Sequence, residues 1–337
     1  MNSEAYLVLA NGQVFKGKSF GATGCKIGEA VFTTGMTGYL ETLTDPSYYG
    51  QIVTQTFPLI GNYGVIPHDF ESSKIHVFGY IVRTPCEVPS NFRCEGTIDS
   101  FLKKNNIIGL SNIDTRALTK VLREAGVMNG MLISGESPEA QKEIKALSDP
   151  KAKEDLLNRI KKFKISKAVE SVTLDADKIE EPADIVFSEA AKYRAVPVTK
   201  DGLKVNDPNL AMKNGKGKKV VLWDFGAKAN IRRELLKRGV SVVTMKSNST
   251  AEEILAQNPD GIMLSNGPGD PQDNIGIITE LKKICEKNIP IFGICLGHQI
   301  LALSRGAKTI KLKYGHRGAN HPVKDLSTGR VYISSQN

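Results

Sequence analysis

The sequence has few cysteines, no Cys-x-x-Cys pair and no long apolar run. Its 337 residues include five cysteines, an odd number whose spacing suits neither a disulfide framework nor a zinc site. Four of them, Cys25, Cys86, Cys94 and Cys285, are therefore expected to be inert thiols in a reducing compartment. The first residues lack the charged and apolar regions of a signal peptide, and no apolar run approaches the ~18 residues of a membrane span. We expect a cytoplasmic protein without membrane contact.

Nucleotide-binding motifs are missing as well. The chain has no Gly-x-x-x-x-Gly-Lys-Ser/Thr loop, and Gly-Lys-Gly-Lys at 215–218 lacks the preceding strand and the spacing of a phosphate cradle. No Gly-x-Gly-x-x-Gly motif follows the first strand of the C-terminal half. The net charge of +9 is not arranged as a basic stripe interleaved with aromatic residues, so it predicts a solvated surface or an acidic partner. We expect no nucleotide cofactor, no metal and no nucleic-acid partner in this chain.

The chain does contain a cysteine between two glycines, Gly293-Ile-Cys295-Leu-Gly297, directly after an apolar stretch. Such a strand-to-helix corner lifts a nucleophile out of a sheet, and a Cβ on either glycine would be expected to block the substrate. The helix expected from Leu296 to about residue 305 points its N-terminus at the sulfur, which favours the thiolate. The Leu296 N–H is placed to hold an oxyanion. A buried cysteine acting as a small hydrophobe is the alternative, but the strand end and Gln299 one turn later favour catalysis.

The C-terminal half alternates between strand and helix patterns. Strands are expected at 220–225, 240–245, 260–265 and 289–295, and helices at 227–238, 250–257 and 274–287. This alternation predicts a doubly wound parallel sheet, which binds ligands at the carboxyl ends of its strands.

Three unusual segments follow such strands, namely 224–228, 265–271 and Cys295. The Ser265-Asn-Gly-Pro-Gly-Asp-Pro271 loop can approach a ligand closely and offer an N–H to the same oxyanion as Leu296. An ordinary Gly/Pro turn is the alternative for this loop. The convergence of the three segments predicts one site.

These motifs resemble the class I (triad-type) glutamine amidotransferase domain. The first half is similar to the small subunit of carbamoyl-phosphate synthase, through Gly-Met-Thr-Gly-Tyr at 35–39, Leu-Thr-Asp-Pro-Ser-Tyr at 43–48, and the segments 51–54, 61–62 and 113–119. Later segments, 315–316 and 318–323, fit it too. The resemblance spans the chain except residues 136–218. It implies a flavodoxin-like amidotransferase domain behind an N-terminal mixed β/α domain.

The resemblance also implies a reaction and its residues. The chain would hydrolyse L-glutamine through a thioester on Cys295 and pass ammonia to a large subunit, which makes carbamoyl phosphate from bicarbonate with ATP and Mg²⁺ for pyrimidine and arginine biosynthesis. The oxyanion donors would be Leu296 and Gly269. The residues that hold glutamine would be Ser47, Gly267, Gly269, Leu296, Gln299 and Asn337. Because Ser47 belongs to the first domain, the resemblance places the glutamine site at a domain boundary.

The family continues beyond Asn337, where it carries the triad histidine and glutamate. General acid–base help contributes ~10²–10⁴-fold to such reactions, and none of the five histidines of this chain is expected to replace it. His298, the nearest in sequence to Cys295, should point along its helix and away from the corner. The sequence as written therefore predicts little glutaminase turnover.

The predicted organisation is an N-terminal domain at 1–135, a charged connecting segment at 136–217 and an amidotransferase domain at 218–337. Asn11-Gly12 between alternating apolar runs predicts a hairpin, and 114–125 is expected to be helical. Two functional alternatives stay open. One is a non-catalytic scaffolding subunit of the same heterodimeric complex, and the other is a stand-alone cysteine hydrolase.

Overall fold

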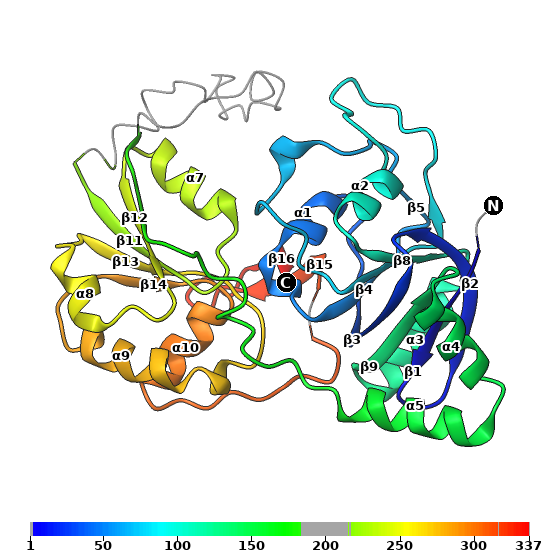
Figure 1. Cartoon of the computed structure of the whole chain (residues 1–337). Helices are drawn as coiled ribbons and strands as arrows, with labels where there is room; N and C mark the ends of the chain where they lie inside the picture. The colour runs from blue at the N-terminus through cyan, green and yellow to red at the C-terminus, as the bar shows by residue number, and fades with distance from the viewer. Residues whose placement is uncertain (1–2, 183–214, 216, 316, 337) are drawn as a thin grey trace.

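The computed structural model describes residues 3–182, 215, 217–315 and 317–336, which form two domains lying side by side (Figure 1). The first domain contains a closed barrel in the strand order β1-β2-β8-β6-β4-β3-β9. These strands are β1 (Glu4–Leu9), β2 (Val14–Gly21), β3 (Gly24–Thr33), β4 (Gln51–Gln55), β6 (Gly79–Ile81), β8 (Ile108–Ser111) and β9 (Met128–Ser134). Closure leaves the barrel without a free strand edge.

Neighbouring barrel strands run in both directions. The pairs β3–β4, β4–β6 and β6–β8 are parallel, and the other pairs are antiparallel. The predicted hairpin is confirmed, since β1 pairs with β2 around Gly12 at φ 88°. A short parallel pair, β5 (Leu59–Ile60) with β7 (Thr84–Pro85), lies outside the barrel.

Helices connect and cover the barrel strands. They are α1 (Tyr39–Thr44), α2 (Ile98–Lys104) and α3 (Thr115–Ala125), with short 3₁₀ turns η1 (Pro46–Tyr48) and η2 (Pro67–Asp69). The helix predicted at 114–125 is α3, whose first turn is capped by the Asp114 side chain. The segment from α1 to η1 carries Asp45 and Ser47 on the side of the first domain that faces the second domain.

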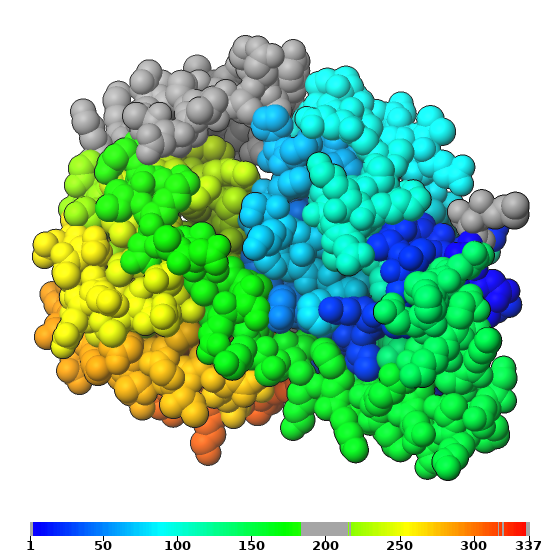
Figure 2. Space-filling view, viewed as in Figure 1, coloured from blue at the N-terminus to red at the C-terminus, as the bar shows by residue number. Residues whose placement is uncertain are grey.

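The described part of the predicted connecting segment is folded. Helices α4 (Pro138–Ala146) and α5 (Pro150–Lys162) pack on the barrel through Ala140, Leu156 and Ile160. The chain then crosses to the second domain, where β10 (Lys178–Glu180) joins the sheet; Figure 2 shows this green stretch lying on the surface of that domain. The rest of the predicted segment, including most of its basic end, lies outside the described residues.

The second domain is built on a sheet in the order β10-β12-β11-β13-β14. The strands β11 (Lys219–Asp224), β12 (Ser241–Lys246), β13 (Gly261–Leu264) and β14 (Ile291–Gly293) are parallel, as predicted, and only β10 is antiparallel. The sequence placed the last strand at 289–295, but the described strand is shorter, because the chain leaves the sheet at Gly293 to form the corner at Cys295.

Helices cover both faces of this sheet, which makes the domain doubly wound (Figure 1). Helix α7 (Ala229–Lys237) packs on one face through Leu236. Helices α8 (Ala251–Ala256), α9 (Ile275–Cys285) and α10 (Leu296–Ser304) pack on the other face, around Trp223 and Phe225. A 3₁₀ turn, η5 (Pro271–Asp273), precedes α9. A hairpin of β15 (Gly318–Lys324) and β16 (Val331–Gln336) lies near the boundary with the barrel.

Candidate active site at the domain boundary

Cys295 occupies a strained corner between β14 and α10. Its φ of 50° and ψ of −110° are unusual for a residue with a side chain, and strain of this kind costs on the order of 1–3 kcal/mol. The side chain is exposed to solvent. Strain that is retained at an accessible thiol is typical of a nucleophile, so the geometry favours the catalytic interpretation of this cysteine over a packing role.

The two glycines around Cys295 have a structural reason in addition to the one predicted. A Cβ on Gly293 would lie 2.6 Å from backbone atoms of Gly297 and His298, and a Cβ on Gly297 would lie 2.4 Å from the Leu264 carbonyl oxygen. The predicted role of the glycines in substrate access stays a prediction. The structure adds that they allow the first turn of α10 to pack directly against the ends of β13 and β14.

The groups around the Cys295 thiol shift its pKa in opposite directions. Desolvation by the walls of the site and the Asp45 carboxylate raise the pKa of Cys295, whereas the Leu296 N–H, Lys228 and Arg317 lower it, and the net direction is upward. The N–H at the start of α10 thus acts as predicted but does not by itself produce the thiolate.

The loop after β13 packs against the corner formed by Cys295 and Leu296. Ser265 is buried and its Oγ accepts a hydrogen bond from the Phe225 N–H at 2.8 Å. A Cβ on Gly267 would meet the Phe225 carbonyl oxygen at 2.3 Å and a Leu296 methyl group at 2.7 Å. Gly269 has a φ of 87°, which favours glycine. The structure thus brings Gly267 next to Leu296, as the predicted site requires.

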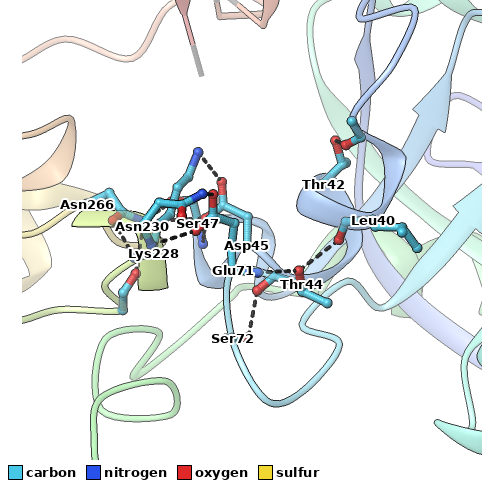
Figure 3. Close-up of polar contacts among 12 residues, drawn as sticks. Leu40, Thr42, Thr44, Asp45, Ser47, Glu71, Ser72, Lys228, Asn230 and Asn266 are labelled. Carbon is cyan, nitrogen blue, oxygen red and sulfur yellow. Dashed lines mark hydrogen bonds and ion pairs between the residues drawn. The ribbon is translucent and has the colours of Figure 1, made fainter. Parts of the chain in front are cut away.

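Ser47 of the barrel reaches this loop across the domain boundary. The Asn266 Nδ2 donates to the Ser47 Oγ at 2.9 Å, to the Gly226 carbonyl oxygen at 2.9 Å and to the Asp45 Oδ1 at 3.3 Å (Figure 3). The Asn266 Oδ1 accepts from the Lys228 N–H at 2.9 Å. Asn266 therefore joins the barrel to two loops of the second domain at the predicted site.

An ion pair lies beside this contact. The Lys228 Nζ is 2.9 Å from the Asp45 Oδ2, and Asp45 is almost fully buried. Burial lowers the pKa of Lys228, but the Asp45 carboxylate outweighs this effect and the net pKa direction is upward. Lys228 is therefore a cation in the wall of the site, and its charge is offset by a carboxylate from the other domain.

Asp224, at the end of β11, has a structural role. Its Oδ1 accepts from the N–H groups of Gly226 and Ala227, and its Oδ2 accepts from the Leu174 N–H at 2.7 Å. These bonds fix the turn before α7 and tie the connecting segment to it. Asp224, which lies in a segment of the predicted site, thus holds the backbone around Gly226 in its turn.

The remaining predicted residues are placed as follows. Gln299 lies in the first turns of α10, exposed, with its N–H bonded to the Cys295 carbonyl oxygen at 3.1 Å. Asn337 lies outside the described residues, as does His316. His298 is exposed on α10. The binding of glutamine by Ser47, Gly267, Gly269, Leu296, Gln299 and Asn337 stays a prediction.

Sequence reasoning missed the residues that join the two domains. Asp45, Lys228 and Asn266 were inside quoted motifs but received no role, because their partners are more than 180 residues away in the chain. Glu71, which contacts the start of α7, lies in no motif at all. Only Asp45, Lys228 and Asn266 could have been found from the sequence, through the motifs that contain them.

A cavity of about 570 Å³ lies behind the Pro268-Gly269 turn. Segments 165–170, 247–250 and 268–280 contribute its walls, but neither Cys295 nor Ser47 does. Cys295 therefore does not line this cavity. Within the described ranges, no cluster of histidine, cysteine or acidic side chains is suited to a metal ion, and no helix there combines the length and apolar character needed to cross a bilayer.

Comparisons with known proteins agree with this geometry. Residues 7–132 match the family model for the carbamoyl-phosphate synthase small chain, CPSase domain, and residues 221–337 match glutamine amidotransferase class-I. Among solved structures, a putative GMP synthase protein from Thermoplasma acidophilum is 30% identical over 30% of this chain and 51% of its own, with a TM-score of 0.27. That likeness is too small to carry an argument.

Curated relatives match across nearly the whole chain. The carbamoyl phosphate synthase small chain of Clostridium perfringens is 46% identical over 99% of this chain and 82% of its own length. That of Vibrio cholerae is 45% identical over 100% of this chain and 82% of its own. The pyrimidine-specific small chain of Bacillus subtilis is 46% identical over 98% of this chain and 78% of its own length. Because relatives at 45–46% identity match nearly the whole chain and both domains match their family models, the chain belongs to the carbamoyl-phosphate synthase small chain family.

Proposed function

We propose that this chain is the glutamine-hydrolysing subunit of a carbamoyl-phosphate synthase and that Cys295 is its nucleophile. The observation that carries the proposal is the strained, solvent-exposed cysteine at the start of α10, facing a loop that is joined to Ser47 of the barrel. This arrangement explains why a chain of this family needs both domains.

The reaction begins when the Cys295 sulfur forms a bond to the side-chain amide carbon of glutamine. The amide oxygen becomes an oxyanion, which the N–H groups of Leu296 and Gly269 stabilise. The carbon–nitrogen bond then breaks, and ammonia leaves after its nitrogen has taken a proton. Water attacks the γ-glutamyl thioester, which releases glutamate and returns the thiol.

Substrate binding is assigned to both domains. Ser47 would contact glutamine from the barrel, and Gly267, Gln299 and Asn337 would contact it from the amidotransferase domain. The raised pKa of Cys295 means that turnover requires a base. The curated relatives are longer than this chain.

The ammonia would be used by a large-chain partner, which combines it with bicarbonate and ATP. In this proposal the present chain holds no cofactor, and ATP and Mg²⁺ bind to the large chain. The assembly is a heterodimer in the cytoplasm, and its product serves pyrimidine and arginine biosynthesis. The name of the Bacillus subtilis relative, which is pyrimidine-specific, supports the first of these pathways.

A Cys295→Ser variant in complex with the large chain tests the proposal. We expect glutamine-dependent synthesis of carbamoyl phosphate to fall by roughly 10³-fold or more, because the thioester cannot form. Synthesis from added ammonium should be unchanged, since it bypasses the thiol. Glutamine-dependent synthesis that survives the substitution would contradict the proposal. A wild-type complex that uses only ammonium would favour the scaffolding alternative.

A further inference from the structure

Glu71, a barrel residue outside every motif, caps a helix of the other domain. Its carboxylate accepts hydrogen bonds from the Asn230 N–H at 3.0 Å and from the Asn230 Nδ2 at 2.8 Å, and its carbonyl oxygen accepts from the Ala229 N–H at 2.7 Å (Figure 3). These backbone donors are the first N–H groups of α7, which have no partner within the helix. The N-cap residue of α7, Lys228, makes no side-chain capping bond. Glu71 provides the cap in its place.

Glu71 is also held by hydrogen bonds within its own domain. Its N–H donates to the Thr44 Oγ1 at 2.9 Å, and the neighbouring Ser72 Oγ donates to the Thr44 carbonyl oxygen at 2.6 Å. Glu71 itself is only 6% exposed. A buried carboxylate with several donors in defined directions holds its surroundings in one arrangement, because any displacement leaves a charge unsatisfied.

These contacts close into a ring that crosses the boundary twice. Thr44 is followed in the chain by Asp45, whose carboxylate pairs with the Lys228 Nζ at 2.9 Å. Lys228 leads directly into Ala229 and Asn230, which contact Glu71. We call the residues Thr44, Asp45, Glu71, Lys228 and Asn230 the boundary ring. The barrel therefore contacts the first turn of α7 at two points.

The boundary ring is connected to the predicted glutamine site through Asn266 and through Asp45, whose Oδ1 accepts from the Ser47 N–H at 2.9 Å. Asn266 accepts from the Lys228 N–H at 2.9 Å and donates to the Ser47 Oγ at 2.9 Å. If the start of α7 moved relative to the barrel, Asn266 could not keep both bonds. The separation between Ser47 and the Gly267–Gly269 turn would then change.

We propose that Glu71 is a positioning residue for glutamine binding, which holds α7 against the barrel so that Ser47 and the loop after β13 face the same ligand. The inference rests on the proposed function, because it assigns Ser47 and that loop to glutamine. It predicts that loss of the Glu71 contacts weakens glutamine use and leaves ammonium use intact.

Three variants and one control isolate the contact. Glu71→Gln places an amide N–H opposite one of the two Asn230 donors, and Asn230→Asp places two carboxylates together. In the double variant Glu71→Gln/Asn230→Asp, the introduced amide can donate to the introduced carboxylate and still accept from the backbone N–H, so the pairing is restored. Glu87→Gln is the control, since Glu87 is an exposed carboxylate of the same domain that is not a member of the boundary ring.

The measurements use the complex with the large chain. For Glu71→Gln we expect the glutamine KM to rise about tenfold, the size of effect that loss of one hydrogen bond to a charged group produces. The midpoint at which glutamine protects Cys295 from iodoacetamide should rise equally. Ammonium-dependent synthesis should not change. The double variant should return within about threefold of wild type, and Glu87→Gln should match wild type.

The outcomes separate this inference from the proposed function. If wild-type Cys295 gains no protection from glutamine, the proposed function fails. If wild type is protected but Glu71→Gln has the same midpoint, or the double variant is no better than the single ones, only the positioning role fails. Should Glu71→Gln not fold, Asn230→Ala removes the Nδ2 donor to Glu71 together with the Oδ1 acceptor of the Arg233 Nη1; a roughly threefold rise in KM would support the role, and an unchanged KM would overturn it.

Discussion

The two domains contribute to the site by different means. The amidotransferase domain contributes shaped backbone, namely the strained corner at Cys295 and a glycine turn with Gly269 at φ 87°, together with the side chains of Lys228 and Asn266 at the boundary. The barrel contributes side chains, namely Asp45, Ser47 and Glu71, which reach over the boundary. One half of the site is therefore a property of local chain geometry, and the other half exists only when two domains meet.

This difference shows where each half is vulnerable. A backbone site fails when an added atom prevents close packing, because the interior is filled to near-crystalline density. A side-chain site fails when a charge or a hydrogen-bond partner is removed. Three predictions test this contrast, in addition to those for Cys295 and Glu71.

The largest effect is expected at the backbone of the corner. In Gly297→Ala the new Cβ would lie 2.4 Å from the Leu264 carbonyl oxygen, so α10 must move away from β13. We expect a loss of roughly 2–3 kcal/mol in the free energy of unfolding, typical of overpacking. Denaturant titration of the protein measures it.

Gly276→Ala is the control for that substitution. Gly276 is also a helical glycine, but a Cβ there meets nothing within 4 Å. Alanine favours helix over glycine by roughly 0.5–1 kcal/mol, so Gly276→Ala should be neutral or slightly stabilising. Equal destabilisation by both substitutions would show that the contact with Leu264 does not govern the corner.

The next largest effect is a pH dependence of stability caused by His76 of the first domain. Burial is the largest cause that lowers the pKa of His76, to about 4, and its Nε2 lies 3.0 Å from the Ser72 Oγ, next to Glu71. The folded pKa is below the unfolded value of about 6.5, so the unfolded chain binds more protons between these values. Stability should therefore be complete above pH 6.5 and fall as the pH drops toward 4.

Because His76 is half-buried, we expect its share of this loss to be about 1–2 kcal/mol. The free energy of unfolding should be measured by denaturant titration at several pH values for wild type and His76→Gln. The variant should show a shallower decline between pH 6.5 and 4. Parallel curves would show that His76 is not the group responsible.

The smallest effect is expected at the ion pair of the boundary. The Asp45 carboxylate raises the pKa of Cys295 and the Lys228 ammonium lowers it. Asp45→Asn should therefore speed the alkylation of Cys295 by iodoacetamide at pH 8 severalfold, and Lys228→Gln should slow it, because the thiolate is the reactive form. Peptide mass spectrometry follows the rate, with Glu87→Gln as the control. Changes in the same direction would mean that altered access outweighs charge.

Much of the amidotransferase domain could be predicted from the sequence. Buried parallel strands are continuous apolar runs, and the helices carry local start and stop signals, such as the Thr250 capping box of α8. The prediction was wrong where tertiary packing determines the bounds or the presence of a strand. The last strand ends at Gly293, two residues before the predicted end. Strand β10, from a charged segment without a strand pattern, pairs at the edge of the sheet.

The sequence by itself determined the corner at Cys295 and the glycine-rich loop after β13, because each depends on residues close together in the chain, whose backbone preferences and spacing are visible there. Only the tertiary structure determined that Glu71 caps α7 and that Asn266 joins Ser47 to Lys228. Such contacts leave no local pattern, since the residues that make them are ordinary polar side chains until folding brings Glu71 to Asn230, more than 150 residues away in the chain.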